Sequence, residues 1–259
     1  MKKTITLILV LVFTSAIAHG IWLEVVNKGR VGKETTVHIY FGEINNDIRE
    51  EGLKYYDSDR FKGFKILTKA QGSTTTEALS PKPSEKSFGA VFTPKKAGIY
   101  QVVAIGEDAP VRDMSERGRG ISKSNTYLRT IFEASERGKK QEGKIDLSPM
   151  MRYDIVPFPA KNGFGNYDSH TSFWRVDERV YGTFYIDSKP AVGKEIKVVS
   201  PDGWAVVRKT DDKGQFNFTP YKKGKYQAVF QLREKKKGTF QGKEYDTFNI
   251  KSVTLFDIK

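Results

Sequence analysis

The sequence of 259 residues contains no cysteine and only three histidines, His19, His38 and His170. Without cysteine there is no disulfide framework and no thiol nucleophile, so hydrophobic cores alone must stabilise the fold. The sequence also has no Gly-x-Ser-x-Gly elbow, no His-Glu-x-x-His motif and no Walker loop. These absences exclude the common hydrolase, zincin and nucleotide-binding patterns, and we expect a protein that is not an enzyme.

Long apolar runs are absent after the first residues. Lys2 and Lys3 precede an apolar run at 5–13, and the small-residue triplet Ala-Ile-Ala at 16–18 follows it. This is the pattern of a secretory signal peptide, and the run is shorter than the roughly 20 residues that span a bilayer. No cysteine follows it, which excludes a bacterial lipid anchor. We expect removal of residues 1–18, leaving a periplasmic or secreted protein that begins at His19 and has no membrane insertion.

Acidic residues are too few to balance the basic ones. The formal net charge is +13, and removal of Lys2 and Lys3 leaves 13 − 2 = +11. Such a charge suits an anionic cell surface, an anionic glycan or nucleic acid, although a solvated lysine-rich surface is the plainer interpretation. Export and the lack of a nucleic-acid-binding motif argue against nucleic acid as a partner.

One motif occurs twice. The segments FTPKKAGIYQVVA (92–104) and FTPYKKGKYQAVF (218–230) both read Phe-Thr-Pro, a basic turn, a glycine, and then Tyr-Gln before an apolar strand. Proline cannot donate to a strand ladder, so Pro94 and Pro220 belong at strand ends. Gly98 and Gly224 allow a turn with positive φ. The pattern is typical of immunoglobulin-like and transthyretin-like sandwiches, and its repetition indicates two of them.

The rest of the sequence fits this fold. The segment 35–43 alternates apolar and polar residues as a half-buried strand does, and 178–218 is a run of short strands separated by turns. We expect an all-β protein with two tandem β-sandwich domains, the first immunoglobulin-like and the second like transthyretin or a carboxypeptidase regulatory domain. The expected divisions are a signal peptide at 1–18, an N-terminal sandwich at 19–160, a linker at 161–174 and a C-terminal sandwich at 175–259.

The mature start, HGIWLEVVNKGRVGKETTVHIYFGE (19–43), resembles a family of exported bacterial proteins with a domain of unknown function. The segments 153–163, 189–231 and 241–248 are similar to the same family. Its members are labelled as periplasmic components of nickel or cobalt transport, and the resemblance implies a periplasmic binding protein that passes a metal to a membrane transporter. Many members carry an Arg-His pair in their last strands. Here the corresponding segment, TFNIKSVTL (247–255), has no histidine.

A free N-terminal histidine has the chemistry for such a site. Its α-amine and imidazole can close a chelate ring on one cation, and both lose their protons near neutral pH. Nitrogen donors of this kind favour Cu(II) or Ni(II). We therefore expect His19 to bind a divalent transition metal ion, Ni, Co or Cu.

Further ligands are sought among the remaining histidines and nearby carboxylates. In a hairpin turning near 28–32, residues whose numbers sum to about 60 face each other, which places His38 opposite Trp22. The candidate metal ligands are His19, His38, Glu43 and His170, with Glu24 as a weaker one. Each also has an ordinary interpretation as a strand or loop residue. Trp22 is expected to lie in the core or over the site, and Trp204 to cap a turn in the core.

Two other functions remain open. One is a non-enzymatic interaction or adhesion module of tandem sandwiches without metal, which the low histidine count favours. The other is a copper oxygenase acting on polysaccharide, because such enzymes also begin with His, often followed by Gly. Against the oxygenase, no second histidine lies in a recognisable partner motif, and those enzymes usually carry disulfides.

Overall fold

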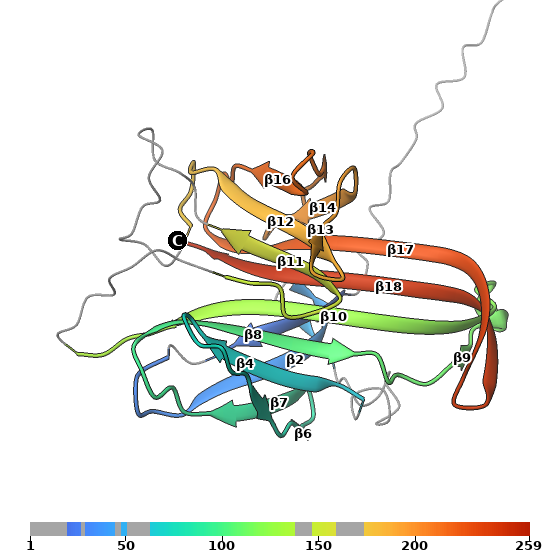
Figure 1. Cartoon of the computed structure of the whole chain (residues 1–259), viewed down its shortest axis with the longest axis horizontal. Helices are drawn as coiled ribbons and strands as arrows, with labels where there is room; N and C mark the ends of the chain where they lie inside the picture. The colour runs from blue at the N-terminus through green and yellow to red at the C-terminus, as the bar shows by residue number, and fades with distance from the viewer. Residues whose placement is uncertain (1–19, 27–28, 45–47, 51–62, 138–146, 159–173) are drawn as a thin grey trace, which may run out of the picture.

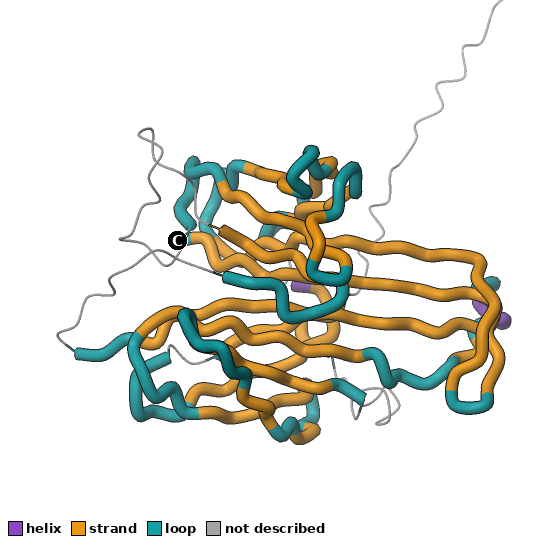
Figure 2. Tube along the Cα trace, in the orientation of Figure 1, coloured by secondary structure: helices purple, strands orange, loops and turns teal. Residues whose placement is uncertain are grey.

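The protein is built from β-strands in three layers, with a long central sheet between two smaller ones. The computed structural model describes residues 20–26, 29–44, 48–50, 63–137, 147–158 and 174–259, apart from the side chain of Arg117. Figure 1 shows the three layers, with β17, β18 and β10 as long strands across the middle. Figure 2 shows that strand dominates the described chain. Among the described residues no helix is long and apolar enough to cross a membrane.

The N-terminal sheet has the strand order β1-β2-β7-β6, with β3 paired to β2. Its strands are β1 (Gly20–Val25), β2 (Thr35–Glu43), β3 (Ile48–Arg49), β6 (Lys82–Pro83) and β7 (Ser87–Phe92). The C-terminal sheet has the order β11-β12-β13, with β16 paired to β12. Its strands are β11 (Tyr153–Phe158), β12 (Val180–Ile186), β13 (Lys189–Pro190) and β16 (Gln215–Phe218).

The central sheet has the order β15-β14-β17-β18-β10-β8-β4-β5, with β9 paired to β10. It consists of β4 (Lys65–Ala70), β5 (Glu77–Leu79), β8 (Gly98–Gly106), β9 (Arg112–Asp113), β10 (Ile121–Ala134), β14 (Glu195–Val199), β15 (Ala205–Lys209), β17 (Gly224–Phe240) and β18 (Lys243–Ile258). One short 3₁₀ turn, η2 (Ser115–Arg117), lies between β9 and β10. β10 and β18 pair in parallel, which joins strands from the two halves of the chain into one sheet.

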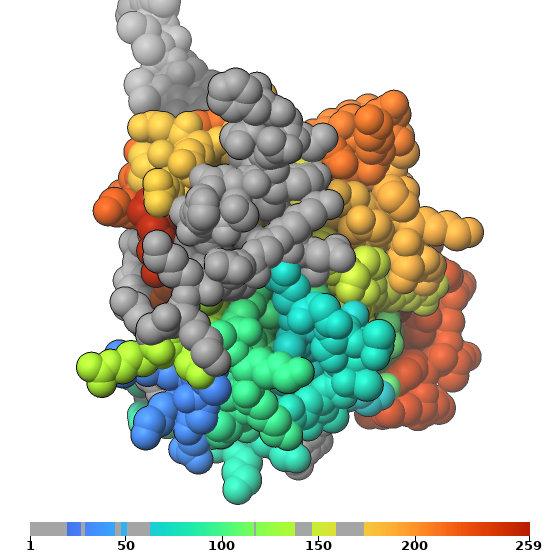
Figure 3. Space-filling model, turned by 60° about the vertical axis from the view of Figure 1, so that its left-hand side comes forward, coloured from blue at the N-terminus to red at the C-terminus, as the bar shows by residue number. Residues whose placement is uncertain are grey.

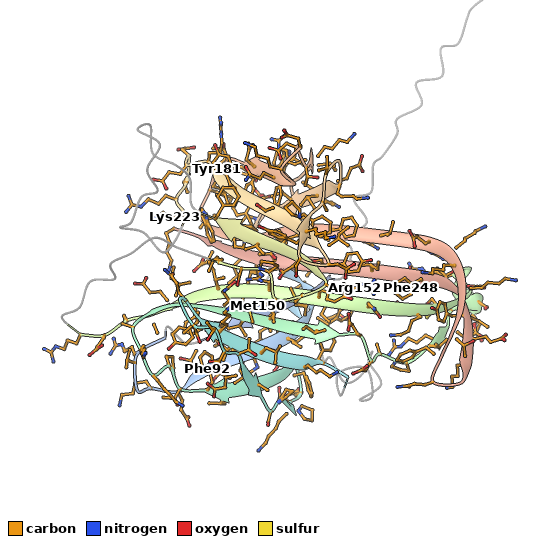
Figure 4. All side chains as sticks on the ribbon, in the orientation of Figure 1. Phe92, Met150, Arg152, Tyr181, Lys223 and Phe248 are labelled. Carbon is orange, nitrogen blue, oxygen red and sulfur yellow. The ribbon has the colours of Figure 1, made fainter. Side chains whose placement is uncertain are left out.

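The two faces of the central sheet cover different cores. Successive side chains of a strand point to opposite faces. In β10, Leu128 and Phe132 pack toward the N-terminal sheet, whereas Tyr127 and Ile131 pack in the core shared with the C-terminal sheet. β10 is therefore covered on both faces, and nearly all of its residues are buried. Figure 4 labels Phe92 in one outer layer and Tyr181 in the other, with Met150 between them.

The all-β fold of two sandwiches is confirmed, and the sandwiches share the central sheet. β11 lies in the range that sequence analysis gives to the N-terminal sandwich, and it pairs with β12 in the C-terminal sheet. The predicted linker, 161–174, lies outside the described residues except for Trp174. Trp174 is buried and bridges to Ile258 at the end of β18.

The repeated motif forms equivalent corners in the two halves. β7 and β16 end at its phenylalanines, and β8 and β17 start at Gly98 and Gly224, with φ of 139° and 129°. The hydroxyl of Tyr100 accepts from the Lys96 amide at 3.2 Å, and that of Tyr226 accepts from the Lys222 amide at 3.4 Å. A tyrosine that bonds back to the chain before it in this way is a recurrent corner of immunoglobulin-like sandwiches.

A buried ion pair ties the central sheet to β11. Arg129 on β10 donates to both carboxylate oxygens of Asp154 on β11, at 2.8 and 2.6 Å, and neither side chain is exposed. Arg129 also donates to the Gln101 side chain at 2.5 Å and to the Ser148 carbonyl at 3.1 Å. Asp154 accepts further bonds from the amides of Met150 and Met151. The pair is thus hydrogen-bonded on every side, as a buried charge pair requires.

Candidate anion-binding groove

The predicted metal ligands are not gathered by the part of the chain that the structure describes. His19 and His170 lie outside the described residues, and among those described no group of three or more His, Asp or Glu side chains could hold a metal ion. Glu43 is the last residue of β2 and pairs with Ile48 of β3. His38 is five residues earlier on the same strand, which places it about 16 Å from Glu43 at about 3.3 Å per residue.

The hairpin register differs from the sequence prediction by two. Residues whose numbers sum to 62 face each other, so His38 lies opposite Glu24 and Tyr40 opposite Trp22. The turn is centred later than expected, because Lys33 donates to the Arg30 carbonyl and Gly32 takes φ of 74°. A shift of two residues keeps every side chain on its predicted face.

His38 and Glu24 belong to a hydrogen-bonded cluster. Nδ1 of His38 lies 2.8 Å from the Ser87 hydroxyl, and burial lowers the pKa of His38 below its usual 6.5 although Glu24 opposes this shift. The carboxylate of Glu24 accepts from Trp22 Nε1 at 3.1 Å, from Arg49 at 3.4 Å and from Lys225. Two cations and an indole thus engage Glu24, which explains how a nearly buried carboxylate is stabilised.

A groove of about 440 Å³ lies beside the start of β1, against the central sheet. Its polar floor comes from alternate residues of three neighbouring strands, which share one face. Two cross-strand rows follow from the pairing: Arg233, Asn249 and Ser124 form one row, and Gln231, Lys251 and Thr126 form the next. Neighbours within a row are separated by the strand spacing of about 4.8 Å, so the floor is a regular grid of donors and acceptors.

The walls of the groove come from two different parts of the chain. Ile21 of β1 and Phe41 of β2 provide an apolar wall at one side. The loop around β9 and η2 provides the other wall, with Pro110, Arg112 and Arg119. The full set of lining residues is Ile21, Phe41, Ala109, Pro110, Arg112, Met114, Arg119, Ser122, Ser124, Asn125, Thr126, Gln231, Arg233, Asn249, Ile250 and Lys251.

Hydrogen bonds fix the loop wall and the floor. Arg233 on the floor donates to the carbonyl of Arg119 in the loop at 3.0 Å, and within the floor Asn249 Nδ2 donates to the Ser124 hydroxyl at 3.3 Å. The loop turns back at Gly120, where φ is 66° and a Cβ would come within 2.9 Å of the Asp246 carboxylate. The glycine is therefore required both by its backbone conformation and by the close approach of Asp246.

The charged side chains among the described lining residues are all cationic. Arg112, Arg119, Arg233 and Lys251 line it, and the described lining residues include no carboxylate and no histidine. Hydroxyl and amide side chains complete the polar surface. Guanidinium groups bind carboxylate, sulfate or phosphate through pairs of parallel bonds, and amides and hydroxyls bind neutral polar groups. The arrangement suits binding of an anion that carries hydroxyl groups, and it offers no acid–base pair among its described residues.

Sequence analysis did not single out these residues. Its candidates came from the histidines, whereas the groove is formed by polar residues on strands that are far apart in the sequence. A usable signal is the alternation Ser-x-Ser-x-Thr at 122–126, matched by Gln231 and Arg233 on β17 and by Asn249 and Lys251 on β18. Polar residues on strands that are otherwise apolar on the same face mark a break in the core.

Comparison with known proteins finds matches among solved structures, all of them with low sequence identity and low TM-scores. No family model and no curated protein matches the sequence. Among solved structures, the D0-D1 domain of intimin is 9% identical over 91% of this chain and 97% of its own, with a TM-score of 0.25. A BSP domain of a biofilm-associated protein is 12% identical over 89% of this chain and 29% of its own, with a TM-score of 0.23.

A two-domain fibronectin type III segment from chicken tenascin is 10% identical over 90% of this chain and 98% of its own, with a TM-score of 0.23. The chain is, as its own strands show, an all-β protein built from β-sandwiches.

Proposed function

We propose that this protein is an exported, non-enzymatic binding module that takes an acidic oligosaccharide into the groove. The observation that carries the proposal is the combination of four cationic side chains with a grid of hydroxyl and amide groups, without a carboxylate among the described lining residues. A volume of about 440 Å³ lies within the range of small-ligand sites, so the groove suits a short segment of a glycan.

The remaining properties of the chain agree with this function. The predicted signal peptide directs the protein to the periplasm or the outside of the cell, where acidic glycans are present. The net charge of +11 after signal removal favours approach to an anionic surface.

Calorimetric titration with matched sugars tests the proposal. The probes are tri-galacturonate and a heparin-derived hexasaccharide, with galactotriose as the neutral control. We expect saturable binding of at least one acidic probe, no binding of galactotriose, and weaker binding as salt concentration rises. Equal affinity for acidic and neutral sugars, or no binding of either acidic probe, would contradict the proposal.

A second candidate is binding of a divalent transition metal ion, Ni, Co or Cu, for delivery to a membrane transporter. The supporting observation is the β1–β2 register, in which Gly20 faces Gly42 and Glu43 follows next in β2. Cleavage after Ala18 would place the amine and imidazole of His19 one residue before this pair. Such a terminus supplies two nitrogen donors to a metal.

The N-terminal amine provides a clean test of this second function. Mass spectrometry of the exported protein establishes whether His19 is the first residue. Titration with Cu(II), Ni(II) and Co(II) then compares this protein with one that carries an extra residue before His19. A metal function predicts weaker binding by the extended protein, and equal binding by both, or none, argues against it.

A further inference from the structure

Trp204 is exposed, unlike the other two tryptophans. It retains 55% of its surface, whereas Trp22 retains 1% and Trp174 retains 6%. The expectation that Trp204 caps a turn in the core is therefore wrong. An indole normally stabilises a protein by burial of its large apolar area, and a tryptophan held in solvent gives up that contribution.

Trp204 forms an open corner with a second exposed aromatic residue. Tyr221 lies beside it with ring centroids 6.0 Å apart and ring planes at 90°. Tyr221 retains 47% of its surface and in turn contacts the buried Tyr226, at 6.5 Å between centroids. One edge of the corner is thus anchored on the core, while the ring of Trp204 is accessible.

Polar groups stand at the rim of the corner. Asp202 accepts from the Ser200 hydroxyl at 2.5 Å and from the Tyr221 hydroxyl, and Lys222 Nζ lies 3.5 Å from its other oxygen. The bond from Ser200, followed by that from Tyr221, lowers the pKa of Asp202 below its usual range. The rim therefore offers a fixed carboxylate acceptor next to an ammonium donor.

The turn that carries Trp204 is held in place. The Ser200 amide donates to the Trp204 carbonyl at 2.8 Å, and the Gly203 amide donates to the Ser200 carbonyl at 3.0 Å. Pro201 packs against Gly224, where a Cβ would come within 2.7 Å of the proline ring. A backbone held in this way loses little conformational freedom when a ligand covers the ring that it carries.

We propose that Trp204 and Tyr221 form a platform that binds a neutral pyranose ring of the gluco configuration. In its β-linked form all oxygen substituents of such a ring are equatorial, so its faces present only C–H groups, which carry partial positive charge. The face of an indole is negative, and the two surfaces therefore attract each other as they exclude water. Asp202 accepts from sugar hydroxyl groups at the rim, and Lys222 donates to them.

A sugar fits this surface better than a protein does. The apolar part consists of two aromatic rings, far less than the roughly 800 Å² per partner that a stable protein interface buries. Lys222, which lies beside Asp202 at the rim, also disfavours a second copy of this cationic chain. The carboxylate of Asp202 beside the rings disfavours an acidic sugar at this position.

The platform is separate from the groove. Tyr221 precedes the start of β17, and Arg233 of the groove lies nine residues after that start, about 30 Å along the strand. Figure 4 labels Lys223 near the C-terminus, at the opposite end of the molecule from the tip of the β17–β18 hairpin. Figure 3 shows the C-terminal strands in orange as a lobe above the N-terminal strands. Sugar binding at the platform does not depend on the function proposed for the groove.

Tryptophan fluorescence tests the platform directly, because Trp22 and Trp174 are buried and Trp204 is accessible. Cellohexaose and chitohexaose are titrated into the wild-type protein, Trp204→Ala and Val207→Ala. Val207 is the matched control, since it is exposed to the same extent, 55%, on the neighbouring strand β15. We expect a saturable change in emission for the wild type and for Val207→Ala.

Because Trp204→Ala lacks the accessible fluorophore, its titrations with the same sugars are followed by calorimetry. Trp204→Ala should bind the sugars at least about tenfold more weakly, with a melting temperature within a few degrees of the wild type because the ring is exposed. Absence of saturable binding of both sugars overturns the proposal, as does equal binding by Trp204→Ala. Sedimentation that shows a dimer lost in Trp204→Ala would also overturn it, in favour of self-association.

Discussion

Replacement of Arg129 by methionine should destabilise the protein strongly, because Asp154 would be left as a buried charge without a cation. Both side chains are fully buried, and Arg129 donates three hydrogen bonds that join β10 to β8 and β11 and a fourth to the carbonyl of Ser148. Loss of one partner of a buried pair costs about 3–5 kcal/mol. Since about 1 kcal/mol corresponds to roughly 2–4 °C in a chain of this size, the melting temperature should fall by about 6–20 °C.

The same chain provides a matched control for this prediction. Arg152 and Asp187 form an ion pair at 3.1 Å, but their side chains are 54% and 61% exposed. Arg152→Met removes the same group from an exposed pair, which should cost at most about 1 kcal/mol. Urea unfolding and calorimetry of both variants give the comparison. If the two substitutions destabilise the protein equally, the Arg129–Asp154 pair does not hold the central sheet to β11 as we infer.

Three further predictions concern stability. Gly224→Ala should lower the melting temperature more than Gly98→Ala, because only the first places a Cβ against Pro201; equal losses would contradict this. Burial lowers the pKa of Lys123 to about 8 from 10.5, so the unfolded chain binds more protons between these values. The urea midpoint of the wild type minus that of Lys123→Met should therefore increase as pH rises from about 8 to 10. A difference that does not change with pH would refute this prediction. Burial also lowers the pKa of His38 below 6.5, so stability relative to His38→Gln should fall as pH falls from about 7 to 5, which the same midpoints measure.

Local patterns in the sequence were sufficient for the strands and the fold class. The alternation in 35–43 corresponds to β2, and the repeated Phe-Thr-Pro motif correctly placed the ends of β7 and β16 and the starts of β8 and β17. These features depend on neighbours in sequence, such as the proline that ends a strand and the glycine that allows a turn.

Pairing between distant strands was beyond such patterns. β10 and β18 are separated by more than a hundred residues, and their parallel pairing makes the two sandwiches share a sheet. The groove depends on that same pairing, since Ser124 and Asn249 become neighbours only there. The predicted hairpin register was wrong by two residues, because alternation fixes which face of a strand a residue occupies but not which residue it pairs with.

Affinity of the groove for an acidic sugar is the most direct test of the proposed function. The measurement is calorimetric titration of tri-galacturonate into the wild type, Arg119→Gln and Lys237→Gln. Arg119→Gln keeps the backbone carbonyl that Arg233 binds, and Lys237 is an exposed lysine on the same hairpin as Arg233, outside the groove lining. A hydrogen bond to a charged group contributes about 1.5–3 kcal/mol, so Arg119→Gln should weaken binding about tenfold or more while Lys237→Gln binds as the wild type does. Equal losses in both variants would mean that the sugar responds to net charge alone, and the groove would not be its site.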